Sequence, residues 1–278
     1  MLDELMMTAA SYAPPSVKRW ARAAGLGGAH PQHPRLRGMG VVTDLHFWVC
    51  DETVDTVLPL QNWYSALFPT VETPTQGMLQ ILTAHGQVLA TETITLPPHA
   101  LVTRRLSAMV GTLRPPVAQF GTIRWCLAMP PAVRTLLADQ QPFYFWDRFA
   151  VGYQGRSGPP SFVHGVDKTW VEPVGRPPFP WYPAYGKTRT WTPEIPITVT
   201  RPQSVALLFI NRIRQTATIT CQADSHTTVV TVAPLGAQRV WLPVGGFVRV
   251  TVSGLPTTWG RPILMYHRAD GSVDALHT

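Results

Sequence analysis

The chain has 278 residues, which is enough for two domains of about 100 residues, each with its own core. Apolar residues make up 45% of the chain and charged residues only 14%, against about 25% charged residues in typical soluble domains. The formal net charge of +7 favours anionic partners. However, no compact basic run of the kind found in nucleic-acid-binding tails occurs, so nucleic acid is not the expected partner.

Residues 1–39 predict an N-terminal arm with two short helices, the first over Leu2–Ala10 and the second over Ser16–Ala24. Acidic residues stand where a secretory signal requires basic ones, and no apolar stretch reaches the ~18 residues that span a bilayer. We therefore expect a cytoplasmic protein without a transmembrane segment. The arm is expected to pack on its own chain, on a neighbouring subunit or on a membrane surface.

Residues 40–155 predict a first β-sandwich module. A strand is expected over 41–49, a hairpin over 77–96 that turns at His85-Gly86, and further strands over 102–113, 122–129 and 143–153. A short helix with proline at its start is expected near 130–141. Short strands with Pro and Gly between them are typical of a sandwich or a barrel.

Residues 156–200 form a predicted linker that is rich in proline, glycine and aromatic residues. A flexible linker would be polar and rich in serine. The aromatic content instead indicates that this segment packs on something.

Residues 201–278 predict a second β-sandwich module. The segments SVALLFIN, TATITCQA, TTVVTVA, AQRVWLP, GFVRVTVSG and PILMYHR are each expected to be strands. Alternation of apolar and polar residues in TATITC and FVRVTV indicates strands with one buried face.

Matching segments recur in the same order in the two predicted modules. TLPPHALVTRRL at 95–106 matches TVAPLGAQRVWL at 231–242, and GTIRWCL at 121–127 matches GFVRVTV at 246–252. The predicted fold class is therefore mainly β, with two tandem, duplicated antiparallel β-sandwich modules (immunoglobulin- or fibronectin-like) and a short helical N-terminal arm. Three cysteines, Cys50, Cys126 and Cys221, lie within strand patterns and are expected to be buried free thiols.

No P-loop, dinucleotide-binding, nucleophile-elbow or zinc-protease motif occurs, so we expect no enzyme and no cofactor. The one metal-like pattern is His164 and Asp167 in FVHGVDK. With a second histidine, they would form a facial site for Fe(II), as in an oxygenase, or serve a hydrolase. His46, His85 and His267 are the candidates for that second histidine. In the structural alternative, His164 bonds to the backbone and Asp167 caps a turn.

Two further groups are candidate partner-binding residues. Asp147 and Arg148 end an aromatic strand, where they form either an ion pair between modules or a ligand contact. The aromatic residues of the linker bind extended peptides, stack on sugar rings, or pack the modules together. These residues are Trp170, Phe179, Trp181, Tyr182, Tyr185 and Trp191.

Strand edges provide a further binding mode. The open edges of sandwiches accept an extended segment of another chain, and a low content of charged residues leaves these edges with less protection than usual. The leading hypothesis is therefore a non-catalytic interaction protein that binds an extended peptide or protein segment, either as a substrate-peptide carrier or as a structural subunit of a homo- or hetero-oligomeric assembly. The alternatives are a carbohydrate-binding tandem sandwich and an iron-dependent oxygenase or hydrolase that uses His164 and Asp167.

Overall fold

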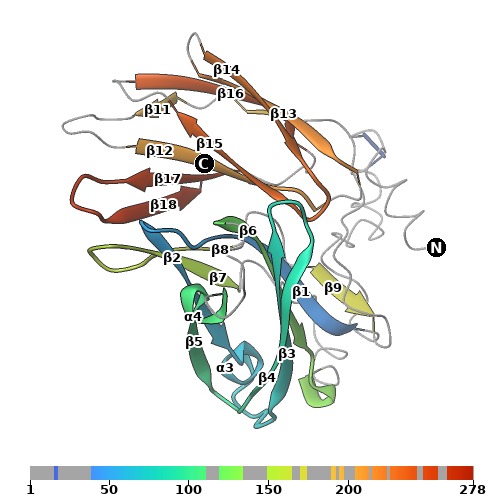
Figure 1. Ribbon diagram of the computed structural model, residues 1–278. Helices are drawn as coiled ribbons and strands as arrows, with labels where there is room; N and C mark the ends of the chain where they lie inside the picture. The colour runs from blue at the N-terminus through green and yellow to red at the C-terminus, as the bar shows by residue number, and fades with distance from the viewer. Residues whose placement is uncertain are drawn as a thin grey trace.

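The computed structural model describes residues 16–17, 39–110, 119–133, 149–164, 170–173, 189–191, 194–196, 204–212, 215–223, 226–242, 247–255 and 262–277. Within these ranges the chain is mainly β and forms several antiparallel sheets (Figure 1). The predicted mainly-β class is confirmed. Apart from residues 16–17 and 39, the predicted N-terminal arm lies outside the described residues.

The first unit comprises β1 to β9 and two short helices. Its elements are β1 (Met39–Val49), β2 (Val54–Gln61), α3 (Trp63–Leu67), β3 (Thr75–Thr83), β4 (Val88–Leu96), β5 (Leu101–Arg105), α4 (Leu106–Val110), β6 (Phe120–Ala128), β7 (Ala150–Gly155), β8 (Ser161–His164) and β9 (Trp170–Pro173). One sheet has the order β4-β3-β6-β1-β9 and the other the order β5-β2-β7-β8. Leu79 and Ile81 of the first sheet share one core with Leu58 and Leu60 of the second.

The second unit comprises β10 to β18. Its strands are β10 (Arg189–Trp191), β11 (Glu194–Pro196), β12 (Ser204–Ile210), β13 (Ala217–Ala223), β14 (His226–Val232), β15 (Ala237–Leu242), β16 (Phe247–Leu255), β17 (Ile263–His267) and β18 (Val273–His277). One sheet has the order β10-β16-β13-β14, with β11 also paired to β16, and the other has the order β15-β12-β17-β18. Strands β2 to β8 and β12 to β18 thus follow the same sequence of pairings.

Strand β12 is buried on both faces. Val205, Leu207 and Phe209 pack against the sheet of β13 and β16. Ala206 and Leu208, on the opposite face, belong to the core of the first unit. The continuous apolar run SVALLFI accounts for this arrangement, because a strand that is covered on both faces has no need of polar alternation. In Figure 1 the sheet of β12 accordingly lies between the remaining sheet of the second unit and the first unit.

Several local expectations meet a clear outcome. The hairpin about His85-Gly86 forms as expected, and Gly86 adopts a φ of 75°, which its turn requires. The strand expected over 102–113 ends at Arg105 instead and continues as α4. Asp55 on β2 fixes the first turn of this helix, because its carboxylate accepts hydrogen bonds from the amide and hydroxyl of Ser107 at 3.0 and 2.7 Å.

The range interpreted as a linker contains strands. Strands β8 and β9, between residues 161 and 173, pair with β7 and β1 of the first unit. Strands β10 and β11, between residues 189 and 196, both pair with β16 of the second unit. This segment thus contributes backbone to the sheets on either side of it.

The three cysteines are free, as expected. Cys126 and Cys221 are buried, and Cys50 is partly buried. No helix in the described part of the chain is long and apolar enough to cross a membrane.

Candidate functional site

The structure describes the side chains of only a few of the binding and metal-ligating residues that the sequence predicts. Trp170 lies in β9 and Trp191 in β10, and only their backbones are described. The candidates outside the described residues are Asp147, Arg148, Asp167, Phe179, Trp181, Tyr182 and Tyr185. His164 is described: it ends β8, is exposed, and stacks on His277 of β18 with ring centroids 3.8 Å apart.

The two units meet in close backbone contact. The turn of the β3–β4 hairpin lies against the turn that joins β14 to β15, and the amide of Ala237 donates a hydrogen bond of 3.0 Å to the carbonyl of Ala84. A Cβ on Gly86 would lie 2.0 Å from the carbonyl oxygen of Pro234, and one on Gly236 would lie 2.3 Å from that of Ala84. Glycine is therefore required at both positions for the units to approach this closely.

A buried charged pair crosses the same junction. Asp44 of β1 is fully buried, and one carboxylate oxygen lies 3.3 Å from a guanidinium nitrogen of Arg212, which follows β12 and is also buried. The imidazole of His46 lies 3.6 Å from the other carboxylate oxygen. Burial first, and then Arg212, lower the pKa of His46 from 6.5 to about 3. His46 is therefore neutral at physiological pH, and its contact with Asp44 is not an ion pair.

Three histidines gather near this pair. The positive charges that His164 and His277 can carry also lower the pKa of His46, although less than burial and Arg212 do. The structure thus brings His164 near one of its three predicted second ligands. Among the residues described, however, no group of three or more His, Cys, Asp or Glu is placed to hold a metal ion. Asp167 lies outside that set, so the iron-site hypothesis stays a prediction.

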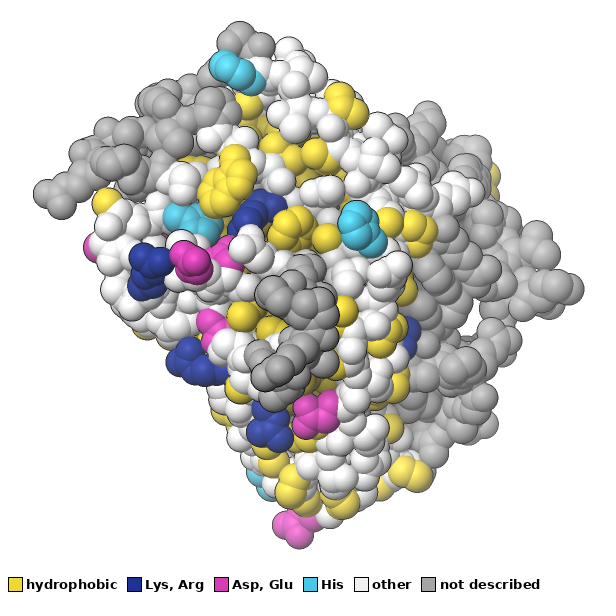
Figure 2. Space-filling model, in the orientation of Figure 1, with side chains coloured by type: hydrophobic (Ala, Val, Ile, Leu, Met, Phe, Trp, Pro, Cys, Tyr) yellow, Lys and Arg dark blue, Asp and Glu magenta, His cyan; other side chains and the backbone are white. Residues whose placement is uncertain are grey.

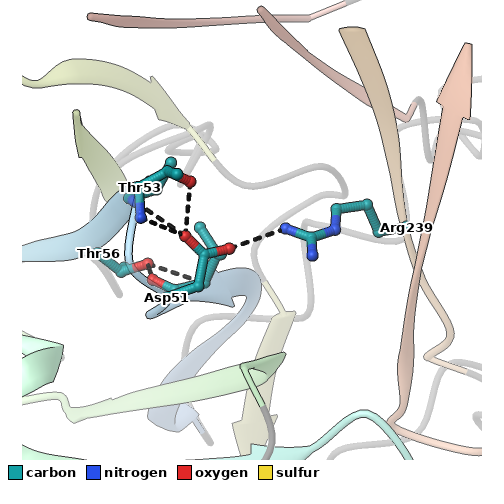
Figure 3. Close-up of polar contacts among 6 residues, drawn as sticks. Asp51, Thr53, Thr56 and Arg239 are labelled. Atoms are coloured by element: carbon teal, nitrogen blue, oxygen red, sulfur yellow. Dashed lines mark hydrogen bonds and ion pairs between the residues drawn. The ribbon is translucent and has the colours of Figure 1, made fainter. Parts of the chain in front are cut away.

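A second charged pair crosses the junction nearer the surface (Figure 3). Arg239 of β15 donates to the carboxylate of Asp51 at 3.1 Å. The same carboxylate accepts hydrogen bonds from the amide and hydroxyl of Thr53 at 2.8 and 2.7 Å. Burial on its own would raise the pKa of Asp51, but the hydrogen bonds from Thr53, Arg239 and Val54 together hold it below its usual value.

Aromatic rings surround the guanidinium of Arg239. It lies 5.3 Å from the ring centroid of Phe120 in the first unit and 5.0 Å from that of Trp241 in the second. Trp241 also contacts the ring of His267, with centroids 5.1 Å apart. Stacking on the rings of Phe120 and Trp241 and the ion pair with Asp51 hold the guanidinium of Arg239 in a fixed position between the two units.

The second unit is open along one side. A cleft of about 270 Å³ lies between its two sheets. Cys221 and Ala223 of β13 and His226 and Thr228 of β14 line one wall, and residues 240–242 of β15 line the other. The lining contains no Asp, Glu, Lys or Arg. The cleft therefore suits an uncharged group.

Both strands that flank the cleft end their sheets. In the part of the chain that is described, β14 pairs only with β13, and β15 pairs only with β12. The ladder between β13 and β14 runs without a register shift, and β14 contains no charged side chain other than the titratable His226 and no proline. Five of its side chains are exposed, with Val229 60% exposed. Along residues 226–232 this edge therefore lacks the bulges, the prolines and the Asp, Glu, Lys or Arg side chains that protect edge strands.

Nucleophilic chemistry finds little support in the cleft. Burial raises the pKa of the Cys221 thiol to about 11. Because the thiolate is the reactive form, Cys221 is a poor nucleophile at neutral pH.

The molecular face in Figure 2 carries acidic and basic side chains close together, with hydrophobic side chains between them. No broad single-sign patch is visible on that face. Neither protein-family models nor curated proteins nor solved structures match the chain.

Sequence reasoning missed the residues that join the two units. Asp44, Asp51, Arg212 and Arg239 were not singled out, and neither was the cleft beside Trp241. One usable signal existed for Asp44 and His46, because two polar residues on one face of an otherwise apolar strand indicate a buried polar contact. No pattern among neighbouring residues in the sequence predicts the cleft, because its walls come from strands that are brought together only by the pairing in the sheets.

Proposed function

We propose that this protein is a non-catalytic interaction protein that binds an extended polypeptide segment by strand addition to the edge of β14. The observation that carries the proposal is the edge of β14, which has no Asp, Glu, Lys, Arg, proline or register shift, beside a cleft that is also lined by none of these four charged residue types. Unpaired backbone amides and carbonyls at such an edge hydrogen-bond to an incoming strand without regard to its side chains, and pockets beside the edge provide specificity.

The edges of the first unit differ in a way that supports this choice. Strand β4 carries Glu92, and β5 carries Arg104 and Arg105. Arg104 lies 3.8 Å from Glu92, so an ion pair bridges the two edge strands. Charged side chains on edge strands protect a sheet edge from adding a further strand. The edge of β14 in the second unit has no such pair among its described contacts, and we assign binding to this edge.

The proposal extends to the origin of the two units. The repeated order of pairing and the matching segments of sequence support descent from one duplicated sandwich module of immunoglobulin-like type. In this interpretation the first unit holds the second unit in place through the Asp51–Arg239 ion pair. The second unit carries the edge strand that binds the partner. The aromatic residues of 156–200 and the N-terminal arm remain predicted contributors to partner binding.

Selection from a library of random linear peptides displayed on phage tests the function. Wild-type protein is expected to enrich a set of peptides over an unrelated control protein. Val229→Lys places a charge on the outer face of the edge strand, and its recovery of the enriched peptides should fall by about tenfold or more, because a lysine there opposes strand pairing.

The matched control for this selection is Thr218→Lys. Thr218 is also exposed on the outer face of the same sheet, but it lies on β13, which has a strand on either side. It should retain wild-type recovery. Failure to enrich any peptide, or equal loss in the two lysine variants, would contradict strand addition at β14.

A further inference from the structure

The cleft beside β14 exists because the second unit has small side chains where the first unit has large ones. In the first unit, the inward-facing pairs on the β3–β6 ladder include Leu79 with Trp125 and Gly77 with Leu127. The indole of Trp125 covers Gly77 so closely that a Cβ there would lie 2.0 Å from a ring carbon. The core between the sheets of the first unit is thus filled by a large aromatic ring.

The corresponding ladder in the second unit carries smaller pairs. Cys221 faces Val252, and Ala223 faces Val250. Both Cys221 and Ala223 line the cleft, and no aromatic ring stands between these strands on the β13–β16 ladder. The space that Trp125 occupies in the first unit has no equivalent side chain in these pairs.

The edge strands show the same substitution. In the first unit, Ile94 of β4 lies opposite Gly77 and is buried in the core. The equivalent residue of the second unit is Thr228 of β14, which lies opposite Cys221, is exposed and lines the cleft.

The connections that follow β5 and β15 differ as well. Residues 106–119 lie between β5 and β6 and include α4, whose Leu106 is fully buried and whose Met109 and Val110 pack against the core. Only residues 243–246 lie between β15 and β16. The first unit therefore supplies its own apolar side chains at this end of the sandwich, and the second unit has no comparable insertion.

We infer that the cleft is the specificity pocket of the binding edge and takes one large apolar side chain, aromatic or branched aliphatic, from the bound segment. This inference rests on the proposed strand addition at β14. Alternate residues of an added strand point to the same face, so one residue in two of the segment would face the cleft and its neighbours would face outward beside Thr227 and Val229. The lining has no Asp, Glu, Lys or Arg that could pair with a charged side chain, so a charged anchor residue is disfavoured.

A series of fluorescein-labelled capped heptapeptides, Thr-Val-Thr-Xaa-Thr-Val-Thr, tests the inference by fluorescence anisotropy. With Xaa as Leu or Phe, binding to the wild-type protein should be about tenfold tighter than with Ala, because burial of such a side chain is worth one decade or more of affinity. With Xaa as Asp or Lys, binding should be weaker than with Ala.

Two variants fill the cleft. Ala223→Leu adds a side chain from the buried wall, and Thr228→Phe adds one from an exposed position, so the second variant keeps its fold if the first is overpacked. Both should bind the Leu and Ala peptides within about twofold of each other, because the anchor can no longer enter. Thr218→Lys, on the outer face of β13, should retain the wild-type preference for Leu.

The outcomes of the peptide titrations distinguish the inferred specificity pocket from the proposed strand addition at β14. Equal affinity of the wild-type protein for the Leu, Phe and Ala peptides, lost on Val229→Lys, would overturn the pocket and leave strand addition standing. A preference for Leu that survives Val229→Lys would overturn strand addition and keep the pocket. If no peptide of the series binds, the pocket as proposed is overturned. Self-association that Val229→Lys abolishes would assign the edge to a second copy and overturn the peptide anchor.

Discussion

At the scale of single residues, the junction depends on charges that have been removed from water. Asp44 and Arg212 are almost completely buried and come from different units. A buried ion pair contributes little net stability, but the loss of one partner is costly because it leaves the other charge uncompensated. The pair therefore specifies how the units meet more than it strengthens the molecule.

Removal of one partner tests this account. Arg212→Leu is expected to lower the free energy of unfolding by about 3–5 kcal/mol, because the Asp44 carboxylate is then buried without its counter-ion. Asp44→Asn in the same chain should restore part of this loss. Urea denaturation of the two single variants and the double variant measures the coupling. Simple addition of the two single losses would show that the residues do not act as a pair.

His46 gives the junction a defined pH dependence. Its pKa is about 3 in the folded protein and 6.5 unperturbed, so between these values the unfolded chain binds a proton that the folded protein does not. Stability is therefore highest above pH 6.5 and falls as the pH decreases towards 3. Between pH 7 and pH 5 the loss from His46 is expected to be about 2 kcal/mol.

Chemical denaturation at several pH values tests this prediction with a matched pair of variants. His46→Gln removes the titrating group and should flatten the stability profile between pH 7 and pH 5. His85→Gln changes an exposed histidine at the turn of the β3–β4 hairpin and should retain the wild-type profile. An unchanged slope in His46→Gln would show that other groups account for acid sensitivity.

At the scale of elements, β12 is the strand on which both cores depend. Leu207 and Leu208 point to opposite faces, and both are buried. In an ordinary half-exposed strand, one of two consecutive residues faces water and tolerates truncation. In β12 neither Leu207 nor Leu208 faces water, so we expect neither to tolerate truncation.

Truncation on each face of β12 should therefore be costly. Leu207→Ala and Leu208→Ala are each expected to destabilise the protein by about 2–5 kcal/mol, through lost burial and the cavity left behind. Val229→Ala on the exposed face of β14 provides the control and should change stability by less than about 0.5 kcal/mol. Thermal or urea unfolding measures all three. A small effect of either leucine variant would show that one face of β12 is not packed as described.

Much of the element structure could be predicted from sequence. Alternation and apolar runs located β1, β3, β4, β6 and the strands of the second unit from β12 to β17, because those patterns are local. Helix α4 was missed because Asp55, distant in sequence, fixes its first turn. Strands β8 to β11 were missed because proline and aromatic residues obscure alternation, and their pairing partners are non-local.

The candidate site was less predictable. The edge-binding mode followed from the low content of charged residues, but the choice of β14 over β4 or β5 required knowledge of the Arg104–Glu92 ion pair. The cleft required the ladder register that sets Ala223 opposite Val250 and Leu79 opposite Trp125. Neither relation can be read from neighbouring residues in the sequence.

At the scale of the whole molecule, the two units share one core. Ala206, Leu208 and Met265 of the second unit belong to the same buried cluster as the core residues of the first. The junction adds the Asp44–Arg212 and Asp51–Arg239 pairs and direct backbone hydrogen bonds. Two units that share buried contacts to this extent are expected to unfold together.

Differential scanning calorimetry tests this cooperativity. Wild-type protein should show one transition whose calorimetric and van't Hoff enthalpies agree. Met265→Ala in the second unit and Ile81→Ala in the first should each move that single transition to lower temperature, because both side chains are fully buried. Two resolved transitions, with only one of them moved by each variant, would show that the units are independent.

The most direct test of the central claim is amide hydrogen exchange on the wild-type protein, alone and saturated with a peptide from the library selection. Strand addition predicts new protection of amides along β14, residues 226–232, while the edge strands β4 and β5 of the first unit stay unchanged. Protection confined to another surface, with β14 unaffected, would contradict the assignment of this edge as the binding site.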